Sequence, residues 1–215
     1  MRRTFAVIFV FVCCIVLVYY FQFTATTSRN NALQAVPDSV LFTSAPVLSP
    51  AQALSTFRLT DGFEIELVAS EPLIKSPIAM TFDNQGRIWV VEMQSYMTDA
   101  DGSEEDGKES RIVILEDNDG DGIMDEAKVF LDSLGMLRAI TMVEGGILYA
   151  DPPNLWFVEN LNDTPGRKIL IDSTYAVGGN PEHQPNGLMR GIDNWYYNAK
   201  SRTRYRYINN EWIIE

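Results

Sequence analysis

The stretch PIAMTFDNQGRIWVVEM, residues 77–93, shows the pattern that decides the fold. An apolar strand leads into an Asp-Asn-Gln-Gly turn, and a strand of aromatic and aliphatic residues returns from it. The pattern recurs as LRAITMVEGGILYAD, residues 137–151, and as NGLMRGIDNWYYNAK, residues 186–200. The three turns begin at Asp83, Glu144 and Asp193, at offsets of 61 and 49 residues. A repeat of about 50 residues with about four strands is typical of the blade of a β-propeller.

A second hairpin follows the first in each unit. RIVILEDNDGDGIMDEAKVFLDS, residues 111–133, is echoed by NLWFVENLNDTPGRKILIDS, residues 154–173, and residues 204–215 begin a third copy. The sequence therefore predicts an all-β chain holding about two and a half blades of a β-propeller. A sandwich whose hairpins resemble each other by chance is the alternative fold. Because propellers have four to eight blades, we expect this chain to be the N-terminal part of a longer one.

The expected elements follow from hydrophobic periodicity and turn residues. Ser49 as N-cap and Pro50 at the first helical position predict a short helix that reaches residue 57. The expected strands are residues 63–70, 77–82, 87–93, 111–116, 127–131, 138–143, 146–150, 155–159 and 167–171.

An apolar run from Phe5 to Phe21 follows Arg2 and Arg3 at the N-terminus. Its length and flanking charge predict a signal anchor or transmembrane helix over residues 1–23, although a cleaved signal peptide is the alternative. Residues 24–48, rich in small and polar side chains, are expected to form a linker. Residues 49–215 would then be the propeller part, anchored to a membrane and facing the periplasm or the cell exterior.

The net charge of −12 argues against nucleic acid as a partner, because a polyanion would be repelled. The acidic loop DNDGDGIMD favours a cation instead. Its carboxylates alternate around a glycine, and calcium takes six to eight oxygen ligands. The predicted ligands are four carboxylates and one backbone carbonyl oxygen, from Asp117, Asp119, Asp121, Ile123 and Asp125. An acidic turn that holds no ion is the alternative, and Lys128, where an EF-hand has its glutamate, excludes a regulatory EF-hand.

His183 is the only histidine of the chain and stands in PEHQPNGLMRGIDNWYY, residues 181–197. An imidazole is able to act as a base, as a ligand or as an ordinary turn residue, and the sequence alone leaves the three roles open.

Three stretches carry a family resemblance: residues 48–93, RIVILEDNDGDGIMDEAKVFLD, and HQPNGLMRGIDNWYYNAKS. With the flanking residues they resemble the bacterial membrane-bound dehydrogenase family over about residues 48–215. Members are exported propeller proteins that are distantly similar to soluble quinoprotein glucose and sorbosone dehydrogenases. Longer members carry a cytochrome c domain, so the resemblance implies such an electron acceptor as a partner.

The resemblance implies oxidation of a sugar or alcohol with pyrroloquinoline quinone, in which His183 is the general base. A truncated chain would be inactive alone, because the cationic cofactor ligands of the sugar dehydrogenases come largely from later blades. The alternative function is a noncatalytic cell-surface propeller that binds glycans or proteins, and whether the protein is an enzyme is left open.

Overall fold

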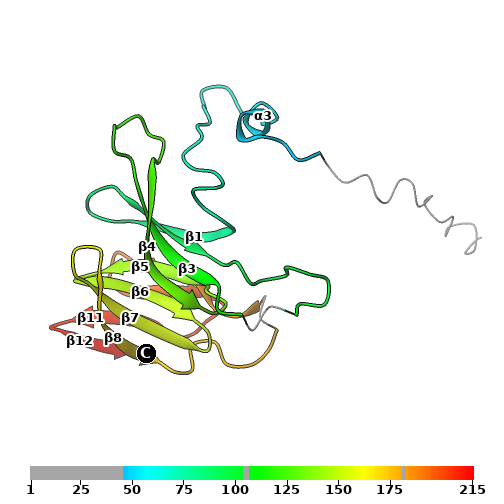
Figure 1. The fold of residues 1–215 in the computed structure, drawn as a ribbon. Coiled ribbons are helices and arrows are strands. Elements are labelled where there is room, and N and C mark those ends of the chain that lie inside the picture. The colour runs from blue at the N-terminus through cyan, green and yellow to red at the C-terminus, as the bar shows by residue number, and fades with distance from the viewer. Residues whose placement is uncertain (1–45, 104–106, 181–182) are drawn as a thin grey trace, which may run out of the picture. The chain divides into compact units, whose positions relative to one another are not determined.

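The computed structural model describes residues 46–103, 107–180 and 183–215. Residues from Pro50 onward form one unit, which is built from strands (Figure 1). A single short helix is described, α3 (Pro50–Leu54), close to the expected helix start. Within the described ranges, no helix is long and apolar enough to cross a membrane. The predicted anchor over residues 1–23 lies outside the described residues, as does most of the predicted linker.

Twelve strands form three four-stranded antiparallel sheets, each a meander in which consecutive strands are neighbours. The first sheet contains β1 (Pro77–Phe82), β2 (Ile88–Glu92), β3 (Ser110–Glu116) and β4 (Glu126–Leu134). The second contains β5 (Ala139–Val143), β6 (Gly146–Asp151), β7 (Asn154–Asn160) and β8 (Pro165–Asp172). The third contains β9 (Asn186–Arg190), β10 (Tyr196–Ala199), β11 (Tyr205–Ile208) and β12 (Glu211–Ile214).

The predicted all-β class is confirmed, but the count of two and a half units is wrong because the third sheet has all four strands. The last hairpin closes within the chain at Asn209 and Asn210, whose φ angles are 51° and 64°. Two consecutive residues with positive φ form the turn that best matches the twist of a two-residue hairpin, and asparagine tolerates this conformation. Strands of only four residues, β11 and β12, then complete the sheet.

The strand expected over residues 63–70 is also wrong, since this segment forms no helix or strand and pairs with none of the described strands. Its backbone joins the first sheet's loop through the N–H of Met124, which donates to the carbonyl oxygen of Val68 over 2.8 Å. Ala69 packs against the first sheet, while Phe63 is exposed. The alternating apolar residues therefore form no ladder here, and of the segment only Ala69 packs against the buried cluster of the first sheet. The other expected strands are confirmed within a few residues.

The strands β2, β3 and β6 are buried on both faces, which explains their nearly continuous apolar sequence. In β2, Trp89 and Val91 join a cluster with Tyr149 of the second sheet, whereas Ile88 and Val90 face the segment around Leu73. In β6, the residues next to Tyr149 turn the other way. Leu148 and Ala150 join a second cluster with Tyr196 and Tyr205 of the third sheet.

The three sheets therefore stack face to face, with the second sheet between the first and the third. The first strands of the sheets are also neighbours, because β5 contacts both β1 and β9. Successive meanders that pack face to face with adjacent first strands make a propeller-like arrangement.

Candidate functional site

The meander topology sorts the loops of the domain onto two edges. Turns β1–β2, β3–β4 and β7–β8 lie at one edge, which we call the turn edge. Connections β2–β3, β4–β5, β6–β7 and β8–β9 lie at the opposite edge, which we call the loop edge. The acidic loop belongs to the turn edge, and His183 belongs to the loop edge, so the two predicted sites are separate.

Three of the predicted calcium ligands converge in the β3–β4 loop. Asp117, Asp119 and Asp125 each offer a carboxylate oxygen, and these oxygens lie within 4.8 Å of one another. Gly122, at a φ of 89°, allows the loop to turn, as the sequence indicates. The geometry is compatible with an oxygen-ligated cation.

The loop also satisfies much of its own hydrogen bonding. The two oxygens of Asp117 accept the N–H groups of Gly122 at 2.9 Å and Gly120 at 2.7 Å, and these bonds hold its pKa below the usual value. Asp121 lies outside the converging group, and its Oδ1 accepts the N–H of Ile123 at 2.8 Å. The predicted roles of Asp121 and Ile123 as ligands stay predictions.

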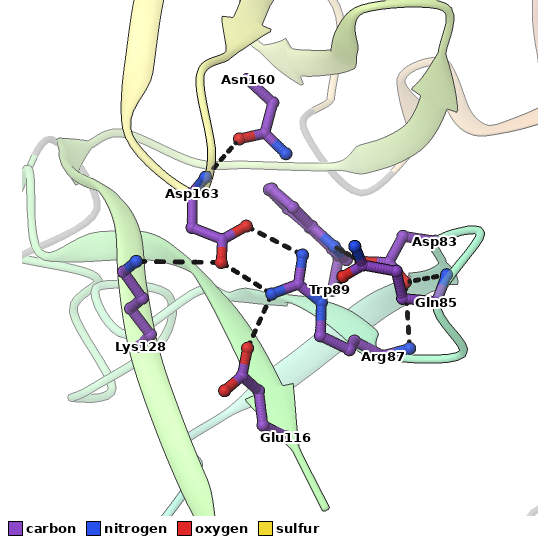
Figure 2. A network of polar contacts seen from close by, with 8 residues as sticks. All are labelled: Asp83, Gln85, Arg87, Trp89, Glu116, Lys128, Asn160 and Asp163. Carbon is purple, nitrogen blue, oxygen red and sulfur yellow. Dashed lines mark hydrogen bonds and ion pairs between the residues drawn. The ribbon is translucent and has the colours of Figure 1, made fainter.

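A network around Arg87 occupies the turn edge between the first two sheets (Figure 2). The guanidinium donates two hydrogen bonds to Asp163 at 2.7 and 2.8 Å, one to Glu116 at 2.6 Å and one to Asp83 at 2.9 Å. Asp83 also accepts the indole N–H of Trp89 at 3.1 Å. Because its hydrogen bonds are made within the chain, we interpret this network as a structural clamp between β2 and the β7–β8 turn.

His183 is exposed and precedes β9, and its backbone N–H donates to the carbonyl oxygen of Asn180 at 2.9 Å. No side-chain hydrogen bond of His183 is found among the described residues, so no third group orients the imidazole there. The predicted role of His183 as a base stays a prediction. Its neighbour Gln184 lines a cavity that the sequence did not indicate.

This cavity lies at the loop edge and has a volume of about 590 Å³. The end of β4 contributes Ser133 and Leu134, β7 contributes Trp156 and β8 contributes Lys168. A volume of this size is in the range of pockets that bind small organic molecules.

Four charged side chains line the cavity: Lys108, Arg138, Asp151 and Lys168. Arg138 is partly buried, and its Nε has no hydrogen-bond partner within the described part of the chain. Burial lowers the pKa of this arginine, because the charged form loses hydration without gaining a carboxylate.

Desolvation also changes the pKa values of Asp151, which is partly buried, and of Lys168, which is exposed overall. It raises the pKa of Asp151, although the N–H of Gly135 donates to Oδ1 at 3.1 Å and favours the charged form. It lowers the pKa of Lys168, and the nearby Asp151 carboxylate offsets only part of this effect. The Lys168 ammonium lies 4.2 Å from the centre of the Trp156 ring, a distance at which cation and ring attract.

Sequence reasoning missed Arg138, Asp151 and Lys168. The available signal was weak. Arg138 and Asp151 flank buried strand segments, but charged residues at strand ends are common and only the sheet register brings these three together.

Comparison with known proteins places the chain in a family. The model of a domain of unknown function, DUF7133, matches residues 49–211, about three quarters of the chain. The chain belongs to the DUF7133 family. The matched residues include the first two sheets of this DUF7133 domain and the third sheet up to the start of β12. The family description assigns no activity. No curated protein matches the chain.

A solved structure shares a distant likeness with this DUF7133 domain. It is the crystal structure of a catalytically inactive virginiamycin B lyase from Staphylococcus aureus with quinupristin. The sequence identity is 12% and the TM-score is 0.37, and the match covers 69% of this chain and 44% of the lyase chain. The chain thus spans less than half the length of that structure, and a likeness at this level carries no information on activity.

Proposed function

We propose that this DUF7133 domain binds a small polar molecule in the cavity at the loop edge. The observation that carries the proposal is the gathering of charged side chains, including Arg138, Asp151 and Lys168, around a space of about 590 Å³. Partly buried charges without full pairing are costly to a fold, so they are typically kept where a ligand uses them.

The predicted setting of this function is a membrane-anchored, exported protein with a propeller fold. The face-to-face meanders and the contacts among β1, β5 and β9 support the propeller part of the proposal. The apolar run behind Arg2 and Arg3 supports the anchor. We also propose that the β3–β4 loop binds calcium, on the support of its three converging carboxylates.

Oxidation of a sugar or alcohol is a second candidate function, favoured by the position of His183 beside the cavity residue Gln184. In this candidate the exposed imidazole of His183 takes the proton of the substrate hydroxyl. Bound pyrroloquinoline quinone would supply the hydride acceptor, and a cytochrome c would take the electrons onward. Arg138 and Lys168 carry the charge that suits the carboxylates of this cofactor.

Ligand binding is tested with the full chain, purified in detergent, against a panel of sugars, alcohols and their acids. We expect at least one compound to raise the melting temperature and to give a saturable heat by calorimetry, because ligand that binds only the folded state stabilises it. The variant Gln184→Trp adds a bulky ring to the cavity lining and should weaken this binding.

Gln85→Trp is the matched control, because the exposed Gln85 lies at the turn edge. If no compound binds, or if both tryptophan variants weaken binding equally, the cavity is not the binding site.

A further inference from the structure

The charge of the cavity differs in sign from the charge of the protein. Among the residues that the structure describes, the lining contains three cations, Lys108, Arg138 and Lys168, and one carboxylate, Asp151. The whole chain carries a net charge of −12. A net positive cavity in an acidic protein is therefore a local feature and not a reflection of the average surface.

The cations are also under-compensated. The ion pairs found among the described residues involve neither Arg138 nor Lys168, whereas Arg87 at the turn edge faces three carboxylates. The Nε–H of Arg138 is buried and has no acceptor in the described part of the chain. Arg138 also lines the cavity, and a planar guanidinium matches the geometry of a carboxylate.

Asp151 gives the cavity a second kind of group. Its Oδ1 accepts the N–H of Gly135, which fixes the carboxyl group beside the cations. A carboxyl group in this position is suited to hydrogen bonding with a hydroxyl group of the ligand, as hydroxyls donate and accept equally well.

We infer that the cavity recognises a carboxylate-bearing, hydroxylated small molecule, whose carboxylate lies against Arg138 and Lys168. The inference rests on the proposed ligand-binding function and narrows its substrate class to organic acids. Two sources share the carboxylate, a hydroxylated sugar acid and the quinone cofactor, which carries carboxylates and carbonyl oxygens, and the experiment separates them.

Calorimetry on the full chain in detergent compares three probes: glucuronate, glucose and pyrroloquinoline quinone. Glucuronate and glucose differ only in the group that carries the charge. We expect glucuronate or the quinone to bind at least ten times more tightly than glucose. The variant Arg138→Gln should weaken binding of that acid about 10- to 100-fold, since hydrogen bonds to charged groups are worth this much.

Arg202→Gln is the matched control, because Arg202 is exposed in the connection between β10 and β11 and is not among the lining residues of the cavity. Lys168→Met provides an independent variant with the same expected direction, and a melting curve shows that each variant is folded. Arg138→Gln should leave the melting temperature essentially unchanged, because the Nε–H has no acceptor to lose in the described part of the chain.

Each outcome bears on the inference. If glucose binds as tightly as the acids, or if Arg138→Gln and Arg202→Gln behave alike, the carboxylate inference is wrong while the proposed binding function stands. If none of the probes and no compound of the wider panel binds, both are wrong. Acid binding that depends on Arg138 supports both, and the preferred probe identifies the source of the carboxylate.

Discussion

Replacement of Arg87 by glutamine should destabilise the domain. Among the charged side chains described above, we expect this substitution to cost the most stability. The substitution removes four charge-assisted hydrogen bonds and leaves Asp83, Glu116 and Asp163 facing one another (Figure 2). The side chains of Arg87 and Asp163 are each 18% exposed, between a surface pair and a buried pair. Surface pairs contribute about 0–1 kcal/mol, and breaking a buried pair costs about 3–5 kcal/mol.

We therefore expect Arg87→Gln to lower the free energy of unfolding by about 2–4 kcal/mol. In a domain of this size, each kcal/mol lowers the melting temperature by about 2–4 °C, so the drop should be about 4–16 °C. Thermal and urea unfolding, followed by circular dichroism, measure it. Arg167→Gln is the matched control, because the Arg167–Glu159 pair has an arginine that is 69% exposed and should contribute at most about 1 kcal/mol.

The effect should also depend on pH. Hydrogen bonds from Arg87 hold the pKa of Asp163 below its usual value, so this contribution is present above the unfolded pKa of about 3.9. It is lost as the pH falls through the lower pKa of the folded state. The stability difference between the wild type and Arg87→Gln should thus be constant above about pH 5 and shrink below about pH 4. Equal costs for Arg87→Gln and Arg167→Gln, or a difference that grows in acid, would refute the clamp.

Three further predictions concern the ion, the base and the anchor. Calcium should give a calorimetric heat of binding that a chelator removes, and Asp119→Ala should abolish this heat. Asp121→Ala tests whether a carboxylate outside the converging group also serves as a ligand. Equal heats for wild type and Asp119→Ala would exclude the site. In a longer protein loaded with quinone, His183→Ala should lower dye-linked oxidation of sugars or alcohols by about 10²–10⁴-fold while cofactor binding persists, and unchanged turnover would leave His183 as a turn residue. Cell fractionation should find the chain in the membrane, and protease accessibility should show residues 24–215 outside the cytoplasm. A mature N-terminus after residue 25 would indicate a cleaved signal peptide instead.

Local patterns predicted most of the strands because each strand is encoded by its own residues. The two-faced burial of β2 requires apolar side chains at consecutive positions, and Ile88, Trp89, Val90 and Val91 show this directly. The segment 63–70 was mistaken for a strand because its apolar residues alternate as in a half-buried strand, although Phe63 and Ile65 are exposed. The last hairpin was not predicted as a complete pair of strands. Asn209 and Asn210 form a tight turn only when both residues adopt positive φ, and the sequence does not show their φ angles.

The sequence predicted one of the candidate sites but not the other. The acidic loop was predictable because its ligands are adjacent in sequence. The exception is Asp121, which lies outside the converging group although it shares the alternating spacing. The cavity was not predictable, because Arg138, Asp151 and Lys168 come from three strand segments whose proximity depends on long-range register.

The separation of the loop edge from the turn edge has a consequence for how such domains diversify. The two longest connections, residues 93–109 and 173–185, both lie at the loop edge, while the packing between sheets depends on the strands. Insertions and substitutions in these connections would reshape the cavity without disturbing the buried clusters. We expect homologous domains to vary most in length at these two segments and to acquire different ligands by exchanging them, as antibodies do with their hypervariable loops.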